Sequence, residues 1–244
     1  PASGKGRREL LVIADDAMYR DKRDAQAYDA DLCIASLREE ASFAVLESLV
    51  LAVDRKDKYT RAHSLDVAQL ALMLAEELDL SADERRVLAL AAPLHDVGKI
   101  AIPDAILRKP GPLTAAEQAT VQLHVAYGVV FIRGVLPHEE AVLDAVQHHH
   151  ERWDGLGYPR GVPGFETPLV GRIMQVADAV SAMMLDRPYR RGLPWSIVKE
   201  ELRDAADRQC DPALVEPFIA AMERRLHLGR CGDPHGCPAG IPVA

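Results

Sequence analysis

The sequence has few cysteines, no long apolar segment and no leader pattern, and each absence excludes a class of protein. Its four cysteines are scattered through 244 residues without a C-x-x-C pair, so they do not form the dense disulfide framework of a small secreted domain. The longest apolar runs, such as 87–94, are too short to cross a bilayer. The basic N-terminal residues are not followed by the apolar stretch of a signal peptide. We expect a cytoplasmic chain without a membrane segment.

The chain also has fewer basic than acidic residues. The chain carries 29 Lys and Arg against 37 Asp and Glu, which gives a formal net charge of −8. Proteins that bind nucleic acid by bulk electrostatics usually present a net basic surface. We therefore expect no nucleic acid partner, while a small anionic ligand held by a local group of Arg and Lys stays compatible with this charge.

Strand signals are nearly absent. No segment alternates apolar and polar residues with a period of two, and no Asn-Gly hairpin turn occurs. Apolar residues instead recur at the three-to-four-residue spacing of amphipathic helices. We predict an all-α fold, a helical bundle. The segments with this pattern are 38–53, 63–78, 169–185 and 213–226.

Local signals mark where several helices begin. Ser81 with Glu84, and Thr114 with Glu117, are capping boxes, in which a hydroxyl and a carboxylate satisfy the free N–H groups of a first turn. The second box predicts a helix that continues through VQLHVAYGVVFI. Asp211-Pro212 places an N-cap residue before a proline at the first helical position.

The chain divides into three parts. Residues 31–226 form the helical domain, which carries two Gly- and Pro-rich loops at 102–113 and 152–168. Residues 227–244 contain too many Gly and Pro for a helix, and we predict a disordered tail. Residues 1–30 form a separate short amphipathic segment.

Histidine carries the chemical signal. The chain has nine, and the triplet 148–150 is unusual in an acidic protein. Imidazole and carboxylate together suit iron, manganese or zinc, and a set larger than four indicates more than one ion. A single histidine on an apolar helix face is more often a hydrogen-bonded core residue, so the prediction depends on the whole set. Each candidate lies in or beside a different predicted helix, as in helix-bundle metal sites: His63, His95, Asp96, His124, 148–150 and Asp178.

The segment HDVGKI, residues 95–100, adds an anion-binding feature. An Asp next to a His can bridge two ions while the His binds one of them. Gly98 permits a helix end or a close backbone approach. Lys99 lies one turn from Asp96, where its ammonium group would be near a metal-held phosphate; a solvated charge at a helix end is the alternative.

Five segments together resemble the HD-GYP family of cyclic di-GMP phosphodiesterases, in the family's order and spacing over about residues 41–220. HHHERWDG-x-GYP is highly specific for this family, and its combination with HD-x-GK makes chance similarity negligible. The segments are YTRAHSLDVAQLALMLAEELDL, LHDVGKIAIPDAILRKPGPLT, HHHERWDGLGYPRG, VADAVSAMMLDRPYR and CDPALVEPF.

The resemblance implies an HD-superfamily helical bundle with a buried di-metal site. It implies hydrolysis of cyclic di-GMP to linear pGpG, with or without further cleavage to GMP, in bacterial second-messenger signalling. The two divalent ions would be iron or manganese in first place, with zinc, nickel or another ion as alternatives. Asp96 would be the bridging ligand, and His148 would stay outside the set. The implied metal ligands are His63, His95, Asp96, His124, His149, His150 and Asp178.

The resemblance also implies substrate contacts and shows departures. Lys99 would reach the scissile phosphate, and Arg187 and Arg190 in DRPYR match positions that contact the ligand, where a guanidinium fork suits a phosphodiester. Catalysis would rest on Asp96 and Lys99. Tyr59 stands where some members have a metal-binding Glu, which favours two ions over three. Ser181 stands where many members carry an Asp.

Three further expectations concern supporting residues of the site. His149 and His150 lie about 100° apart on an ideal helix, so a distorted helix end is needed to aim both at neighbouring ions. Glu151 is a candidate for orienting an imidazole from behind, and a solvated loop acid is the equal alternative. Pro93 interrupts the helix before His95 and should alter its bend.

The N-terminal segment LLVIADDAMYRDKRDAQ, residues 10–26, resembles the closing helix of a GGDEF domain. This resemblance implies a GGDEF partner, in the same protein or in another one. An amphipathic linker helix is the alternative. A second copy of this chain is a further candidate partner, because the helix at 31–53 could pair with itself.

Three other functions stay open. The chain could be a receptor that binds the cyclic dinucleotide with little or no catalysis. It could be an HD phosphohydrolase that acts on another cyclic dinucleotide. A zinc-binding module could also form from His227, Cys231, His235 and Cys237, although their spacing is only weakly typical of zinc sites.

Overall fold

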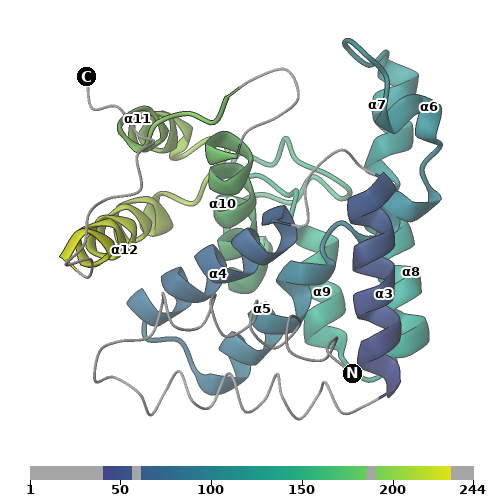
Figure 1. The fold of residues 1–244 in the computed structure, drawn as a ribbon, viewed down its shortest axis with the longest axis horizontal. Helices are drawn as coiled ribbons and strands as arrows, with labels where there is room; N and C mark the ends of the chain where they lie inside the picture. The colour runs from purple at the N-terminus through teal and green to yellow at the C-terminus, as the bar shows by residue number, and fades with distance from the viewer. Residues whose placement is uncertain (1–40, 57–61, 186–190, 232–244) are drawn as a thin grey trace, which may run out of the picture.

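The computed structural model describes residues 41–56, 62–185 and 191–231 (Figure 1). Within these ranges the chain is helical between turns and loops, so the all-α prediction is confirmed. None of the described helices is long and apolar enough to cross a membrane. Residues 10–26, Tyr59, Arg187 and Arg190 lie outside the described ranges. The elements are α3 (Ala41–Lys56), α4 (Ala62–Glu77), α5 (Ala82–Leu94), η1 (Val97–Ala101), α6 (Asp104–Leu107), α7 (Ala115–Gln122), α8 (His124–Val135), α9 (Glu140–His148), η2 (Gly164–Glu166), α10 (Leu169–Met184), α11 (Trp195–Ala205) and α12 (Pro212–Cys231).

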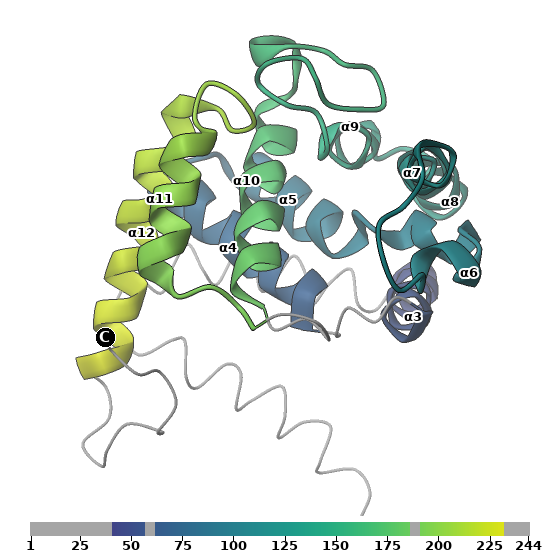
Figure 2. The same cartoon turned by 90° about the horizontal axis from the view of Figure 1, so that it is seen from above.

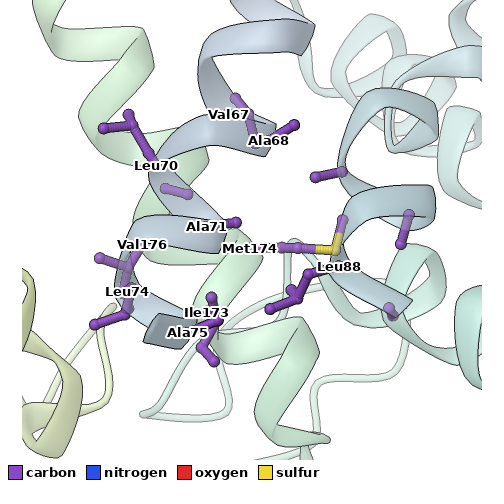
Figure 3. Close-up of a cluster of buried hydrophobic side chains, with 14 of the residues drawn as sticks. Val67, Ala68, Leu70, Ala71, Leu74, Ala75, Leu88, Ile173, Met174 and Val176 are labelled. Atoms are coloured by element: carbon purple, nitrogen blue, oxygen red, sulfur yellow. The ribbon is translucent and has the colours of Figure 1, made fainter. Parts of the chain in front are cut away.

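The centre of the fold is the packing of α4 and α5 against α10. Figure 3 shows Leu74 of α4, Leu88 of α5 and Ile173 and Met174 of α10 meeting in one apolar cluster, and all four are fully buried. Burying one such side chain stabilises a fold by about 1.5–3 kcal/mol. The helical spacing read from the sequence thus places one face of each helix in a common core.

The first described helix packs into the same core. Leu46 and Val53 of α3 are buried, and Leu49 and Val50 pack against the core cluster. Figures 1 and 2 both show α3 beside α8, and the two helices are in contact. Part of the apolar face of residues 41–56 therefore packs on its own chain, while Val45 is 50% exposed.

On the opposite side of α10 from α3, α11 and α12 lie side by side (Figure 2). The carboxylate of Asp211 accepts a hydrogen bond of 2.9 Å from the backbone N–H of Ala213, as expected of a residue that caps α12. This helix continues to Cys231, beyond the predicted end at residue 226. Residues 227–231, assigned to the tail from their composition, are therefore helical.

Both predicted capping boxes are present, at Ser81 with Glu84 and at Thr114 with Glu117. The second helix does not run on as expected. It breaks at Leu123, which separates α7 from α8, so that His124 begins a new helix. The break turns a residue that would lie in the middle of a helix into one at a helix junction.

Candidate metal centre

The seven predicted ligands come together in two buried or half-buried clusters. In each cluster the candidate ligand atoms lie within 4.8 Å of one another. They reach the site from helices far apart in the sequence: α4, the end of α5, the start of α8, the end of α9, and α10. The first cluster contains Asp96, His124, His149 and His150, and the second contains His63, His95 and Asp178.

Three of these histidines lie one or two residues beyond the end of a helix. The last carbonyl groups of an α-helix have no partner within it. Each imidazole Nδ1 lies 2.6–2.7 Å from the carbonyl oxygen three residues earlier. A carbonyl oxygen only accepts, so Nδ1 must carry a hydrogen, and in the neutral ring the lone pair is left on Nε2. The pairs are His95 with Ala92, His124 with Val121, and His149 with Val146.

The Nε2 atoms of His95, His124 and His149 are fully buried and lack a hydrogen-bond partner. Leaving a buried polar atom unpaired costs about 1–3 kcal/mol. Three such atoms grouped with carboxylates in one site are the arrangement that a bound cation would satisfy. Imidazole nitrogen and carboxylate oxygen are donors that suit iron, manganese and zinc, so these residues fit a metal centre.

Asp96 lies between the two clusters. Its Oδ2 is 3.3 Å from Nε2 of His95, and its Oδ1 is 3.4 Å from Nε2 of His124. One carboxylate thus faces an imidazole of each cluster with a different oxygen. Lys99 donates a hydrogen bond of 2.7 Å to Asp96 Oδ2. Burial opposes the charge on Asp96, but Lys99 and His95 hold the pKa of this carboxyl well below its usual range.

The second acid belongs to the other cluster. Asp178 Oδ1 is 3.1 Å from Nε2 of His63 and 4.0 Å from Nε2 of His95. Burial again opposes the charge, but the contact with His63 and the nearby His95 lower the pKa of Asp178 below its usual range. The hydroxyl oxygen of Ser181, one turn further along α10, lies 2.9 Å from Nδ1 of His63. The sequence alone presented this serine only as a departure from the family pattern.

The imidazoles of the first cluster favour the neutral form, which is the form that binds metals. Burial lowers the pKa of His124, lowers that of His149 strongly, and lowers that of His150 to about 4. His95 behaves in the opposite way. Burial works against its positive form, but Asp96 and Asp178 outweigh it and raise its pKa to about 9.

The histidine triplet is split between the end of α9 and the turn that follows it. α9 ends at His148, and His149 and His150 follow it in a turn, so the required distortion is a helix end. His148 is in neither cluster. Its Nδ1 donates to the carbonyl of Asp144 at 2.8 Å, and its Cβ faces Gly171 of α10.

Glu151 neither orients an imidazole nor lies in solvent. It is 2% exposed, and its carboxylate accepts hydrogen bonds from three consecutive backbone N–H groups, those of residues 160–162, at 2.7, 3.2 and 3.2 Å. Both sequence-based interpretations of Glu151 were therefore wrong. Glu151 anchors residues 160–162 of the loop 152–168 to the end of α9. The sequence around Glu151 contains no pattern that predicts this contact.

The anchored loop places Tyr158 over the first cluster. The centroid of its ring lies 4.7 Å from the ring centroid of His150. The backbone N–H of Tyr158 donates a hydrogen bond of 3.2 Å to the carbonyl oxygen of His150. The Tyr158–Pro159 bond is cis. Burial, together with the charges of Asp96 and Asp178, raises the pKa of Tyr158 above its usual range. The phenol therefore keeps its hydrogen, and Tyr158 is a site residue that sequence reasoning treated only as a stiffener of the loop.

With this geometry established, comparison with known proteins defines the class. A family model described as an HD domain matches residues 44–214. The chain belongs to the HD domain family, within its HD-GYP-like group.

The curated relatives include a cyclic di-GMP phosphodiesterase of Thermotoga maritima, which is 38% identical over 182 residues. They also include the 3'3'-cGAMP-specific phosphodiesterase 3 of Vibrio cholerae, which is 41% identical over 198 residues. These matches cover 74% and 78% of this chain but only 50% and 43% of the relatives. The chain thus spans about half the length of the curated relatives that it matches.

Solved structures agree on the fold. The HDG"Y"P protein Bd1817 of Bdellovibrio bacteriovorus gives a TM-score of 0.60 at 15% identity and covers 89% of this chain and 79% of its own. The Vibrio cholerae cyclic GMP-AMP phosphodiesterase V-cGAP3 gives 0.58 at 19% identity and covers 78% and 50%. The described helices thus adopt the helical HD-domain architecture.

Proposed function

We propose that this chain is a metal-dependent phosphodiesterase that hydrolyses cyclic di-GMP to linear pGpG. The observation that carries the proposal is the position of Asp96 between two clusters in which three buried Nε2 atoms have no hydrogen-bond partner. The proposal is supported by relatives named as cyclic dinucleotide phosphodiesterases at 36–41% identity.

One divalent ion would be held by His63, His95 and Asp178, and the other by His124, His149 and His150, with Asp96 contributing an oxygen to each. When bound, such a pair of ions supplies Lewis acidity to a phosphoryl group and makes water more acidic. The chain's own residues hold the imidazoles in the binding tautomer and keep the carboxylates ionised. Iron or manganese is our first expectation for both positions.

Other residues would act on the substrate. Lys99 is held beside Asp96, so its positive charge would favour a phosphodiester at the junction of the clusters. Tyr158 retains its O–H and would donate a hydrogen bond to a ligand in the same place. Arg187 and Arg190 remain our candidates for the phosphates or guanine bases, from a segment outside the described residues.

A second substrate has specific support. Three relatives, 36–41% identical, are named as specific for 3'3'-cGAMP. The seven cluster residues would serve either molecule, because they act on the phosphodiester that both share. Choice between a guanine and an adenine depends on residues that contact the base. Cyclic di-GMP stays the first candidate because HHHERWDGLGYP and DRPYR resemble the motifs of the HD-GYP cyclic di-GMP phosphodiesterases.

The test combines metal analysis with a substrate pair. Protein purified without oxygen is analysed for bound elements and incubated with cyclic di-GMP or 3'3'-cGAMP, and the products are separated by chromatography. We expect metal in the wild type, pGpG from cyclic di-GMP, and loss of both metal and turnover in Asp96→Ala. Arg133→Ala serves as a control, since Arg133 pairs with exposed Glu140 away from both clusters. Unchanged turnover in Asp96→Ala contradicts the assignment.

The same assay separates a receptor from an enzyme. A receptor would bind cyclic di-GMP in the metal-loaded state and release no product over hours. Faster cleavage of 3'3'-cGAMP than of cyclic di-GMP would instead support a phosphodiesterase whose preferred substrate is 3'3'-cGAMP.

A further inference from the structure

His63 lies at a different kind of helix end from His95, His124 and His149. Those three follow a last turn, where free carbonyl groups are available to hold Nδ1. His63 lies in the first turn of α4, and the free backbone groups of a first turn are N–H donors. Its Nδ1 contacts a side chain of another helix, the hydroxyl of Ser181, at 2.9 Å.

Both nitrogens of His63 meet the same face of α10. Nδ1 contacts Ser181, and Nε2 lies 3.1 Å from Asp178 Oδ1. Residues three apart lie on one face of a helix, so Asp178 and Ser181 contact opposite edges of one ring. Ser181 is fully buried. The hydroxyl is therefore fixed in place by the packing of α4 on α10, and it fixes the plane of the imidazole in turn.

We propose that Ser181 is a positioning residue that aims Nε2 of His63 at the metal position shared with His95 and Asp178. This inference rests on the proposed function, because it assumes that the cluster holds an ion. With the hydrogen on Nδ1 the serine oxygen accepts, and the lone pair of Nε2 is presented to the metal. Ser181 thus does for His63 what backbone carbonyls do for the other three.

Loss of the hydroxyl should act on one ion only. In Ser181→Ala the ring of His63 keeps its carboxylate neighbour but loses the contact that sets its plane. Loss of an outer partner of a metal-binding histidine typically weakens metal binding by about 10–100-fold. The cluster of Asp96, His124, His149 and His150 should be unaffected, because backbone carbonyls hold two of its imidazoles.

The experiment is a manganese titration of the full chain, followed by electron paramagnetic resonance. Ser181→Thr restores a hydroxyl at the same place. Thr167→Val removes a different buried hydroxyl, which has no hydrogen-bond partner and lies in neither cluster. Thermal unfolding and circular dichroism verify that each variant folds.

We expect two manganese ions per chain and a spin-coupled spectrum in the wild type, in Thr167→Val and in Ser181→Thr. Ser181→Ala should bind one ion normally and the second about 10–100-fold more weakly, with the spectrum of isolated manganese at one equivalent. A folded Ser181→Ala variant that binds both ions with wild-type affinity overturns the inference alone. A wild-type chain that takes up neither manganese nor ferrous iron overturns the proposed function and the inference with it.

Discussion

Gly98 lies directly against the backbone of His124. A Cβ atom at position 98 would be 1.8 Å from the carbonyl oxygen of His124, and 2.5 Å from the backbone nitrogen of Gly128. The turn η1, which follows Asp96, can approach α8 this closely only because residue 98 has no side chain. The glycine of HDVGK thus sets the distance between Asp96 and the helix that begins with His124.

Replacing Gly98 with alanine should separate η1 from α8, because backbone atoms cannot yield as a flexible side chain can. We expect Gly98→Ala to lower the unfolding temperature and reduce metal content together. The control is Gly134→Ala in α8, where a Cβ meets nothing within 4 Å. That variant should be neutral or more stable, by up to about 1 kcal/mol. Wild-type metal content in Gly98→Ala contradicts the prediction.

Removing the carboxylate of Glu151 should release the loop 152–168. Glu151→Ala leaves three backbone N–H groups, at residues 160–162, without their acceptor. Hydrogen exchange followed by mass spectrometry should show faster exchange at these amides, while the core amides of α10 keep their protection. Asp144→Ala, which removes an exposed acid of α9, is the matched control. Equal exchange of the loop in wild type and Glu151→Ala would show that the anchor is not needed.

Arg172 should matter more for stability than a surface arginine. Its guanidinium pairs with Asp211, which is almost fully buried, and donates to the Thr167 carbonyl at 3.0 Å. Removing one partner of a buried pair costs about 3–5 kcal/mol. We expect a loss of this size for Arg172→Ala in urea unfolding. Arg203→Ala, which breaks an exposed pair with Glu216, should change stability little. Equal effects of the two variants would argue against this ranking.

Cys210 should make stability depend on alkaline pH. Burial raises the pKa of its thiol to about 11, so the folded protein holds the proton more tightly than the unfolded chain. The resulting stabilisation is complete below the ordinary thiol pKa and is lost as the pH rises through 11. We expect the unfolding free energy to fall between about pH 9 and 11, and to fall less in Cys210→Ala. Parallel curves for the two proteins would exclude this contribution.

Helix spacing and capping boxes were enough to predict the class and most helix positions. The break at Leu123 was missed because the apolar pattern continues through it. The extension of α12 to Cys231 was missed because the Gly and Pro content of residues 227–244 as a whole indicated a tail that begins at residue 227.

The grouping of the candidate ligands could be predicted because residue type and family spacing together restrict the choice. The supporting contacts could not. Glu151 and Ser181 act on partners 9 or more residues away in the chain, through hydrogen bonds that depend on how the loop closes and how α4 meets α10. Tyr158 was misjudged because its ring reaches the clusters only after the loop has closed.

The three carbonyl contacts of His95, His124 and His149 have an evolutionary consequence. A carbonyl oxygen belongs to every amino acid, so exchanges at Ala92, Val121 and Val146 alter packing without deleting the group that holds the ring. These imidazoles are thereby protected from genetic drift at the residues that support them. His63 lacks this protection, because the atom that contacts its Nδ1 is the side-chain hydroxyl of Ser181. A substitution at position 181 that removes the hydroxyl removes the contact.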